Sequence, residues 1–77
     1  MNNMAHNEVA VRITDCMARA ERSQQWTADK SGMAYSTFRR KLRSDIPVFT
    51  VHELARIASA LNVSPSVLLP AEFREAA

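Results

Sequence analysis

The chain has 77 residues, 47 % of them hydrophobic, which indicates one small folded domain and excludes a disordered protein. No apolar run approaches the roughly 20 residues that would cross a bilayer, and the single cysteine, Cys16, has no partner for an internal disulfide. The formal charge of +2 is small, but residues 34–44 hold four of the ten basic side chains and none of the eight acidic ones.

The first predicted element is a helix over about residues 8–22, with Asn7 as its N-cap. Its apolar stripe, at helical spacing, consists of Val9, Ile13, Cys16, Met17 and Ala20. Residues 1–6 lack this pattern, and they also lack the basic start and apolar centre of a signal peptide. We therefore expect a flexible N-terminal arm on a cytoplasmic protein.

A short second helix is predicted over about residues 24–31, with Ser23 as its N-cap. Gly32, the only glycine of the chain, should end this helix, because glycine readily adopts the left-handed conformation that closes a helix. A third helix is predicted over about residues 34–43, with Phe38 facing inward together with Leu42. Its side chains expected to point outward are Tyr35, Ser36, Arg39, Arg40 and Arg43.

The fourth helix has the clearest start, because Thr50 and Glu53 form a capping box and Phe49 and Leu54 a hydrophobic staple. Its predicted buried residues are Leu54, Ile57, Ala58 and Leu61. Asn62 suits the left-handed position after it, and Ser64 should cap a brief fifth helix that begins at Pro65. The sequence thus predicts an all-α fold, a compact bundle of about five short helices over residues 7–70, followed by a short tail, 71–77.

Two short helices joined by a glycine turn, the second with an arginine-rich outer face, describe a helix-turn-helix. The string S-Q-x-x-x-A-D-K-x-G-M-x-x-S over residues 23–36 resembles the lambda-repressor-like family, of the Cro and phage-repressor (XRE-like) type. The later segment VFTVHELARIASALNVSPSVLL, residues 48–69, is similar to the helix and closing turn that follow in that family. The resemblance implies a sequence-specific transcriptional regulator, a repressor that occupies operator DNA through the major groove without a cofactor.

The resemblance also assigns roles to single residues. Those expected to contact base edges are Ala34, Tyr35, Ser36 and Arg40, and those expected near the DNA backbone are Gln24, Thr37, Arg39, Lys41 and Arg43. In addition, Gln24 is expected to buttress the recognition helix. Arg40 is the leading base reader, because arginine can bind guanine O6 and N7 with two hydrogen bonds. The chain departs from the family at Tyr35, where a glutamine is common, and at Thr27 and Ser31, which replace apolar residues and are expected to weaken the local core.

Other side chains favour plainer interpretations. Trp26 is expected to pack partly into the body, and Cys16 to be an inert core thiol. His52 and Glu53 begin like a zinc-protease motif, but Arg56 stands where the second histidine is needed, so no metal site is predicted. No paired nucleophile and base is evident, and we expect no enzyme.

The expected partner is double-stranded operator DNA, and no membrane. A homodimer on a palindromic site and a monomer on adjacent sites both remain open, as do repression and activation. A second hypothesis is a protein-interaction module on the same fold, such as an antitoxin or adaptor, which would hold its partner through the fifth helix and the tail with Phe73.

Overall fold

Side-chain caps begin three of the helices in the computed structural model, which describes residues 7–70. Asn7 caps α1 (Glu8–Ala20), because its side-chain oxygen accepts a hydrogen bond from the Ala10 N–H at 3.0 Å. The helix ends two residues before the expected Arg22, because Glu21 takes the left-handed conformation with φ 57°. The predicted arm over residues 1–6 and the predicted tail over 71–77 lie outside the described residues.

The second and third helices, α2 (Gln24–Lys30) and α3 (Tyr35–Leu42), are joined by the turn at Gly32. The φ of Gly32 is +73°, and the following Met33 N–H donates to the Ala28 carbonyl at 2.9 Å. This backbone bond is typical of a helix closed by a left-handed glycine. The predicted role of Gly32 is confirmed.

The fourth helix, α4 (Val51–Ala60), carries the predicted capping box at its start. Asn62 beyond its end has a φ of 59°, as expected. The fifth element, η2 (Pro65–Leu68), is a 3₁₀ helix that begins at Pro65 as predicted, and Ser64 occupies its N-cap position without a side-chain capping bond. The Ser64 hydroxyl makes no bond to the backbone of the turn and lies instead 3.1 Å from the Ser66 hydroxyl.

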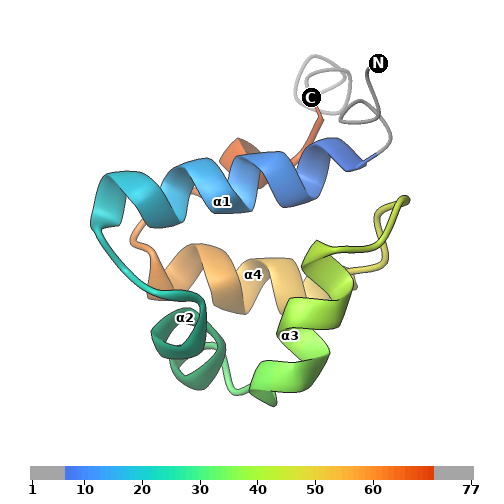
Figure 1. Cartoon of the computed structure of the whole chain (residues 1–77). Coiled ribbons are helices and arrows are strands. Elements are labelled where there is room, and N and C mark those ends of the chain that lie inside the picture. The colour runs from blue at the N-terminus through green and yellow to red at the C-terminus, as the bar shows by residue number, and fades with distance from the viewer. Residues whose placement is uncertain (1–6, 71–77) are drawn as a thin grey trace.

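The helices form an all-α bundle, and no strand occurs in the part of the chain that the structure describes. Figure 1 shows α1 and α4 stacked, with η2 behind α1 and with α2 and α3 on the other side of α4. α4 packs against both α2 and η2, and η2 in turn packs against α1. Between residues 7 and 70, every helix is too short or too polar to cross a membrane.

The core gathers one or more side chains from every helix. Its buried members are Val9, Ile13, Cys16, Met17, Ala28, Phe38, Leu54, Ile57, Ala58, Leu61 and Leu68. This confirms the predicted inner faces of α3 and α4, and it confirms Cys16 as a buried, free thiol. The stripe of α1 stops at Met17, whereas Ala20 is exposed, because it lies in the final turn of α1, beyond the last core residue.

Two hydroxyl side chains of the helix-turn-helix are buried in this core. Thr27 is fully buried and its hydroxyl donates to the Ser23 carbonyl at 2.8 Å. Ser31 is 1 % exposed and its hydroxyl donates to the Thr27 carbonyl at 2.7 Å. Because each hydroxyl bonds to the carbonyl one turn earlier, neither is left unsatisfied in the apolar interior. Thr27 and Ser31 therefore destabilise the core less than buried hydroxyls without hydrogen bonds would.

Candidate nucleic-acid interface

The turn at Gly32 leaves α3 with one buried edge and a wide exposed face. Phe38 is completely buried and Leu42 is half-buried, and the two residues are one turn apart on the inner edge. Ala28 of α2 is 1 % exposed, so the small side chain lets the two helices approach closely. α3 is therefore fixed to the body along one edge while the rest of its surface faces solvent.

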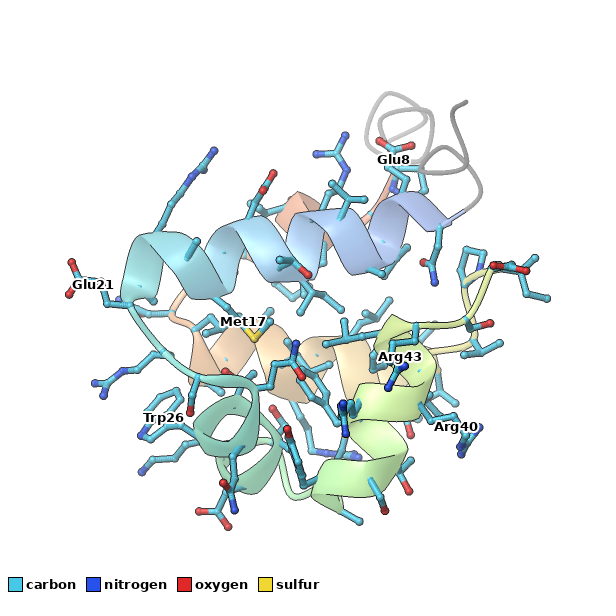
Figure 2. All side chains as sticks on the ribbon, viewed as in Figure 1. Glu8, Met17, Glu21, Trp26, Arg40 and Arg43 are labelled. Carbon is cyan, nitrogen blue, oxygen red and sulfur yellow. The ribbon has the colours of Figure 1, made fainter. Side chains whose placement is uncertain are left out.

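The four residues predicted to contact bases are all exposed: Ala34, Tyr35, Ser36 and Arg40. Tyr35 is 41 % exposed and lines a hollow between α2 and α3. Ser36 and Arg40 are one turn apart on the face opposite Phe38, and Figure 2 shows Arg40 extending away from the body. The structure thus brings Ser36 and Arg40 onto one face, with Tyr35 on the flank toward α2.

Arg43 continues this exposed face by another turn. Arg40 and Arg43 line the same hollow, together with Ser44 and Val48 of the following loop. Neither arginine, nor Arg39, forms an ion pair with another described residue. Three guanidinium groups on α3 are thus free to bind an anionic ligand.

The remaining residues predicted near the DNA backbone differ in their surroundings. Thr37 is half-buried on the flank of α3 toward α4, and Gln24 is exposed at the start of α2. No hydrogen bond among the described residues involves the Gln24 side chain, and its expected buttressing of α3 stays a prediction. Gln24 remains placed where it could contact a phosphate.

Lys41 differs from the arginines because its charge is already paired. Its Nζ lies 2.7 and 2.8 Å from the two carboxylate oxygens of Glu53, and it also lies 5.9 Å from the ring centroid of Phe49. The two side chains of the ion pair are only 14 % and 16 % exposed. A phosphate contact by Lys41 would therefore require the loss of a partly buried ion pair.

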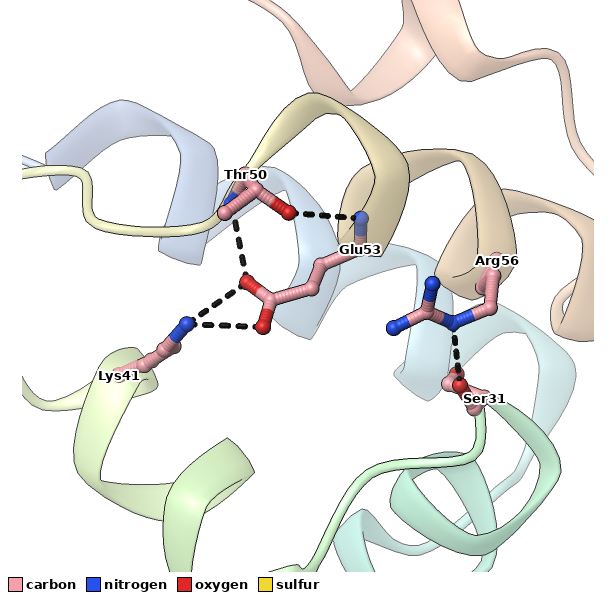
Figure 3. A network of polar contacts seen from close by, with 5 residues as sticks. All are labelled: Ser31, Lys41, Thr50, Glu53 and Arg56. Atoms are coloured by element: carbon pink, nitrogen blue, oxygen red, sulfur yellow. Dashed lines mark hydrogen bonds and ion pairs between the residues drawn. The ribbon is translucent and has the colours of Figure 1, made fainter.

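The same carboxylate also caps α4, so one residue ties α3 to the start of α4 (Figure 3). The Thr50 N–H donates to Glu53 at 2.9 Å, and the Glu53 N–H donates to the Thr50 hydroxyl at 3.0 Å. Burial raises the pKa of Glu53, but the hydrogen bonds from Lys41 and Thr50 and the charges of Lys41 and Arg56 outweigh burial and hold this pKa below its ordinary value.

Two further bonds position the helix-turn-helix, and sequence reasoning did not find them. Arg56 of α4 donates from Nε to the Ser31 carbonyl at 2.8 Å, which fixes the end of α2 (Figure 3). Asn7 donates to the Ser44 carbonyl at 2.7 Å, which fixes the loop after α3. Each bond spans at least 25 residues of sequence, so no local pattern could have indicated it.

The arrangement offers binding groups and no evident site for a metal. Within residues 7–70, no three His, Cys, Asp or Glu side chains lie close enough together to hold an ion. The exposed groups on α3 are hydrogen-bond donors, hydroxyls and positive charges, which suit the base edges and phosphates of a nucleic acid.

The family of the chain agrees with this geometry. The sequence model of the BetR domain matches residues 4–76, nearly the whole chain. A search of curated proteins and a search of solved structures each give no match. The BetR domain is a small, helix-turn-helix-like domain linked to transcription regulation. The closer resemblance to the lambda-repressor-like family remains a prediction, whereas the match over residues 4–76 shows that this chain belongs to the BetR domain family.

Proposed function

We propose that the protein is a sequence-specific DNA-binding regulator of transcription that inserts α3 into the major groove. The observation that carries this proposal is the exposed face of α3 with Ser36, Arg40 and Arg43, whose two arginines form no ion pair with a described residue. The major groove of B-form DNA, about 12 Å wide, admits an α-helix. An exposed, basic helix held at one edge is the geometry that such binding requires.

The proposed contacts follow from the position of each side chain on α3. Arg40 reads a guanine, Ser36 bonds to either partner of a base pair, and Ala34 and Tyr35 contact base edges near the start of the helix. Arg39 and Arg43 neutralise phosphates, and Gln24 and Thr37 add neutral backbone contacts. Lys41 is assigned a different part, because its pairing with Glu53 positions α3 on α4.

Regulation of the phage-repressor or Cro type would follow from occupancy of a promoter. An operator-bound protein blocks transcription simply by covering the site, so the proposed role is binding and not catalysis. The proposed site of action is the cytoplasm, in keeping with the unpaired thiol of Cys16.

We further propose that two copies bind a palindromic operator through an apolar surface beside the end of α3. Ile46 and Val51 are 61 % and 80 % exposed there, next to a groove of about 470 Å³. The groove is lined by Val9, Pro47, Phe49, Val51, Leu54, Leu69 and Pro70. Exposed apolar residues beside an apolar groove suit a two-fold contact, in which each copy supplies both parts.

The position of this surface supports a second copy as the occupant. Val48 lines one hollow together with Arg40 and Arg43, and its neighbours Pro47 and Phe49 line the apolar groove. A second copy seated on the groove would therefore lie beside the proposed DNA-binding face.

Selection of binding sites from random duplexes tests the proposed function. We expect one enriched, two-fold symmetric motif with half-sites about one helical turn apart. Recovery of unenriched sequences from a folded protein would contradict sequence-specific binding. Co-purification with a stoichiometric protein, without retention on DNA, would favour the protein-interaction module instead.

A further inference from the structure

A second basic surface lies on α2 and α4, away from the exposed face of α3. Arg22, Trp26 and Lys30 recur every four residues along α2 and the residues before it. The guanidinium carbon of Arg22 lies 4.1 Å from the ring centroid of Trp26, and the Lys30 Nζ lies 5.8 Å from it. The half-buried indole thus holds two cations at the surface.

A hollow of about 480 Å³ opens between this stripe and α4. It is lined by Trp26, Lys30, Arg56, Ser59 and Ala60. Arg56 is held at its edge by the bond from Nε to the Ser31 carbonyl, and no hydrogen bond among the described residues uses its two terminal nitrogens. The hollow therefore combines an ammonium, a guanidinium and a hydroxyl with an aromatic wall, a set that suits a carboxylate attached to an apolar group.

The charges of this surface are not neutralised by any residue between positions 7 and 70. Arg22, Lys30 and Arg56 form no ion pair with a described residue. Glu53, one turn before Arg56 on α4, is already bonded to Lys41. A ligand with negative charge would thus meet three unpaired cations.

An acid separates the two basic surfaces. The hollow between α2 and α3 is lined by Gln25, Trp26, Asp29, Met33, Ala34 and Tyr35, among which Asp29 is the single charged residue. Figure 2 shows Trp26 and Arg40 on opposite sides of the molecule. Because the Asp29 carboxylate repels phosphates, a duplex on α3 is not expected to extend across to the hollow beside Lys30.

We propose that the surface formed by Arg22, Trp26, Lys30, Arg56 and Ser59 binds an acidic peptide segment of a partner protein. Its carboxylates pair with the three cations, and an apolar side chain of the segment packs on the indole. This site is separate from the proposed DNA-binding face, so the protein could hold DNA and the partner together.

Trp26, the only tryptophan of the chain, reports on this site directly. The test titrates the full chain with a short peptide of Asp, Glu and Leu and follows the tryptophan emission. The control peptide has Asn and Gln in place of the acids. We expect a saturable change with the acidic peptide alone, and no change in a wild-type titration with it would overturn the proposal.

Charge-reversal variants then locate the site. Lys30→Glu and Arg22→Glu should each lower the affinity for the acidic peptide by about five-fold or more, because the new carboxylate repels the carboxylates of the peptide. Arg19→Glu is the matched control, since Arg19 is exposed on α1 and makes no ion pair with a described residue. If Arg19→Glu lowers the peptide affinity equally, the effect comes from net charge, and the proposed site is refuted. Circular dichroism and urea unfolding confirm that each variant is folded.

A duplex carrying the selected DNA motif separates this proposal from the proposed function. Arg40→Glu should abolish duplex binding and leave peptide affinity within about two-fold. Lys30→Glu should weaken peptide binding by about five-fold or more and leave duplex affinity within about two-fold. Loss of duplex binding with Lys30→Glu, with peptide affinity unchanged, would make the surface a DNA contact and refute the proposal. Peptide binding with no duplex binding would refute the DNA-binding function alone.

Discussion

Four basic residues of α3 show how a partner decides what a charged side chain can do. Arg39, Arg40 and Arg43 are exposed without an ion pair to a described residue, whereas Lys41 is paired with Glu53 and half-buried. The arginines can bind a ligand after desolvation alone, which is a small free-energy cost for a weakly hydrated guanidinium group. Lys41 would also have to give up its carboxylate, so we expect it to support the interface and not to bind DNA.

Arg40 and Arg43 should fail in different ways when each is truncated. Arg40→Ala should relax base preference at one position, with a loss of about 1–3 kcal/mol on the preferred site. Arg43→Ala should weaken binding to all duplexes alike and flatten the salt dependence. Affinities for preferred and scrambled duplexes at several salt concentrations distinguish the two. Identical behaviour of wild type and both variants on every duplex would refute these roles.

Glu53 should make stability depend on pH. Its folded pKa lies below the ordinary 4.5, so the carboxylate stabilises the fold above that pH, and this stabilisation is lost as the pH falls through the folded pKa. Glu53→Gln should lower the unfolding free energy at pH 7 by about 1 kcal/mol and make less difference in acid. Urea unfolding at pH 7, 5 and 3.5 measures the effect.

Asp45→Asn serves as the control for this experiment, because Asp45 is an exposed carboxylate that forms no ion pair with a described residue. It should change stability little at any of these pH values. A constant difference between wild type and Glu53→Gln from pH 7 to 3.5 would show that the charge of Glu53 contributes nothing.

The helix-turn-helix combines a glycine turn between its two helices with hydroxyl hydrogen bonds inside α2. Gly32 permits the left-handed turn, and Thr27 and Ser31 bond back along the helix in the interior. Arg56 adds a bond from α4 to the Ser31 carbonyl at the end of α2. The turn therefore joins α2 and α3, and the bond from Arg56 connects the pair to α4.

Substitutions at Gly32 should test the turn without crowding it. A Cβ there would meet nothing within 4 Å, so the cost of Gly32→Ala comes from the φ of +73° alone and should be about 1 kcal/mol. Gly32→Asn should cost less, because asparagine tolerates this conformation, as Asn62 does with a φ of 59°. Urea unfolding of the two variants provides the comparison. Equal losses would show that the conformational preference of the residue is not what matters.

The whole domain presents three different exposed surfaces on a small helical body. The basic face of α3, the apolar surface around residues 46–51 and the basic surface beside Trp26 have different lining residues on a molecule about 29 Å long. The hollow lined by Arg40, Arg43 and Val48 lies between the basic face of α3 and the apolar surface. A second copy seated on the apolar surface would therefore add its own α3 next to the first.

Val51→Glu should separate dimer formation from folding. Val51 is 80 % exposed, and an acid in the first turn of α4 is favourable, so the fold should keep its stability. In the proposed two-fold contact the new carboxylate would be buried without a partner, so it should prevent dimer formation. The affinity for a palindromic duplex should then fall by about ten-fold or more. Sedimentation velocity and the stoichiometry of the DNA complex measure both effects. Val11→Glu, a change at a partly exposed valine of α1, is the control and should leave the oligomeric state unchanged.

Local signals in the sequence were sufficient for the helices and their order. Asn7, Ser23, Gly32 and the capping box at Thr50 were each predicted and are each observed, because caps act through bonds to residues three or four positions away. The exposure of Tyr35, Ser36 and Arg40 also followed from helical spacing alone, since Phe38 and Leu42 define the inner edge. The end of α1 at Ala20 was missed, because Glu21 adopts a conformation that glutamate rarely takes.

Contacts between distant parts of the chain decided which charged side chains are paired and which surfaces form, because the fold brings a charge and its partner together. The sequence showed Lys41 as one of four similar cations, and only packing of α3 on α4 placed it against Glu53. In the same way, only the contact between α2 and α4 placed Arg56 beside Trp26 and Lys30 around one hollow. Residue type and spacing fixed which helix would be exposed and basic, whereas which charges stayed free depended on neighbours many residues away.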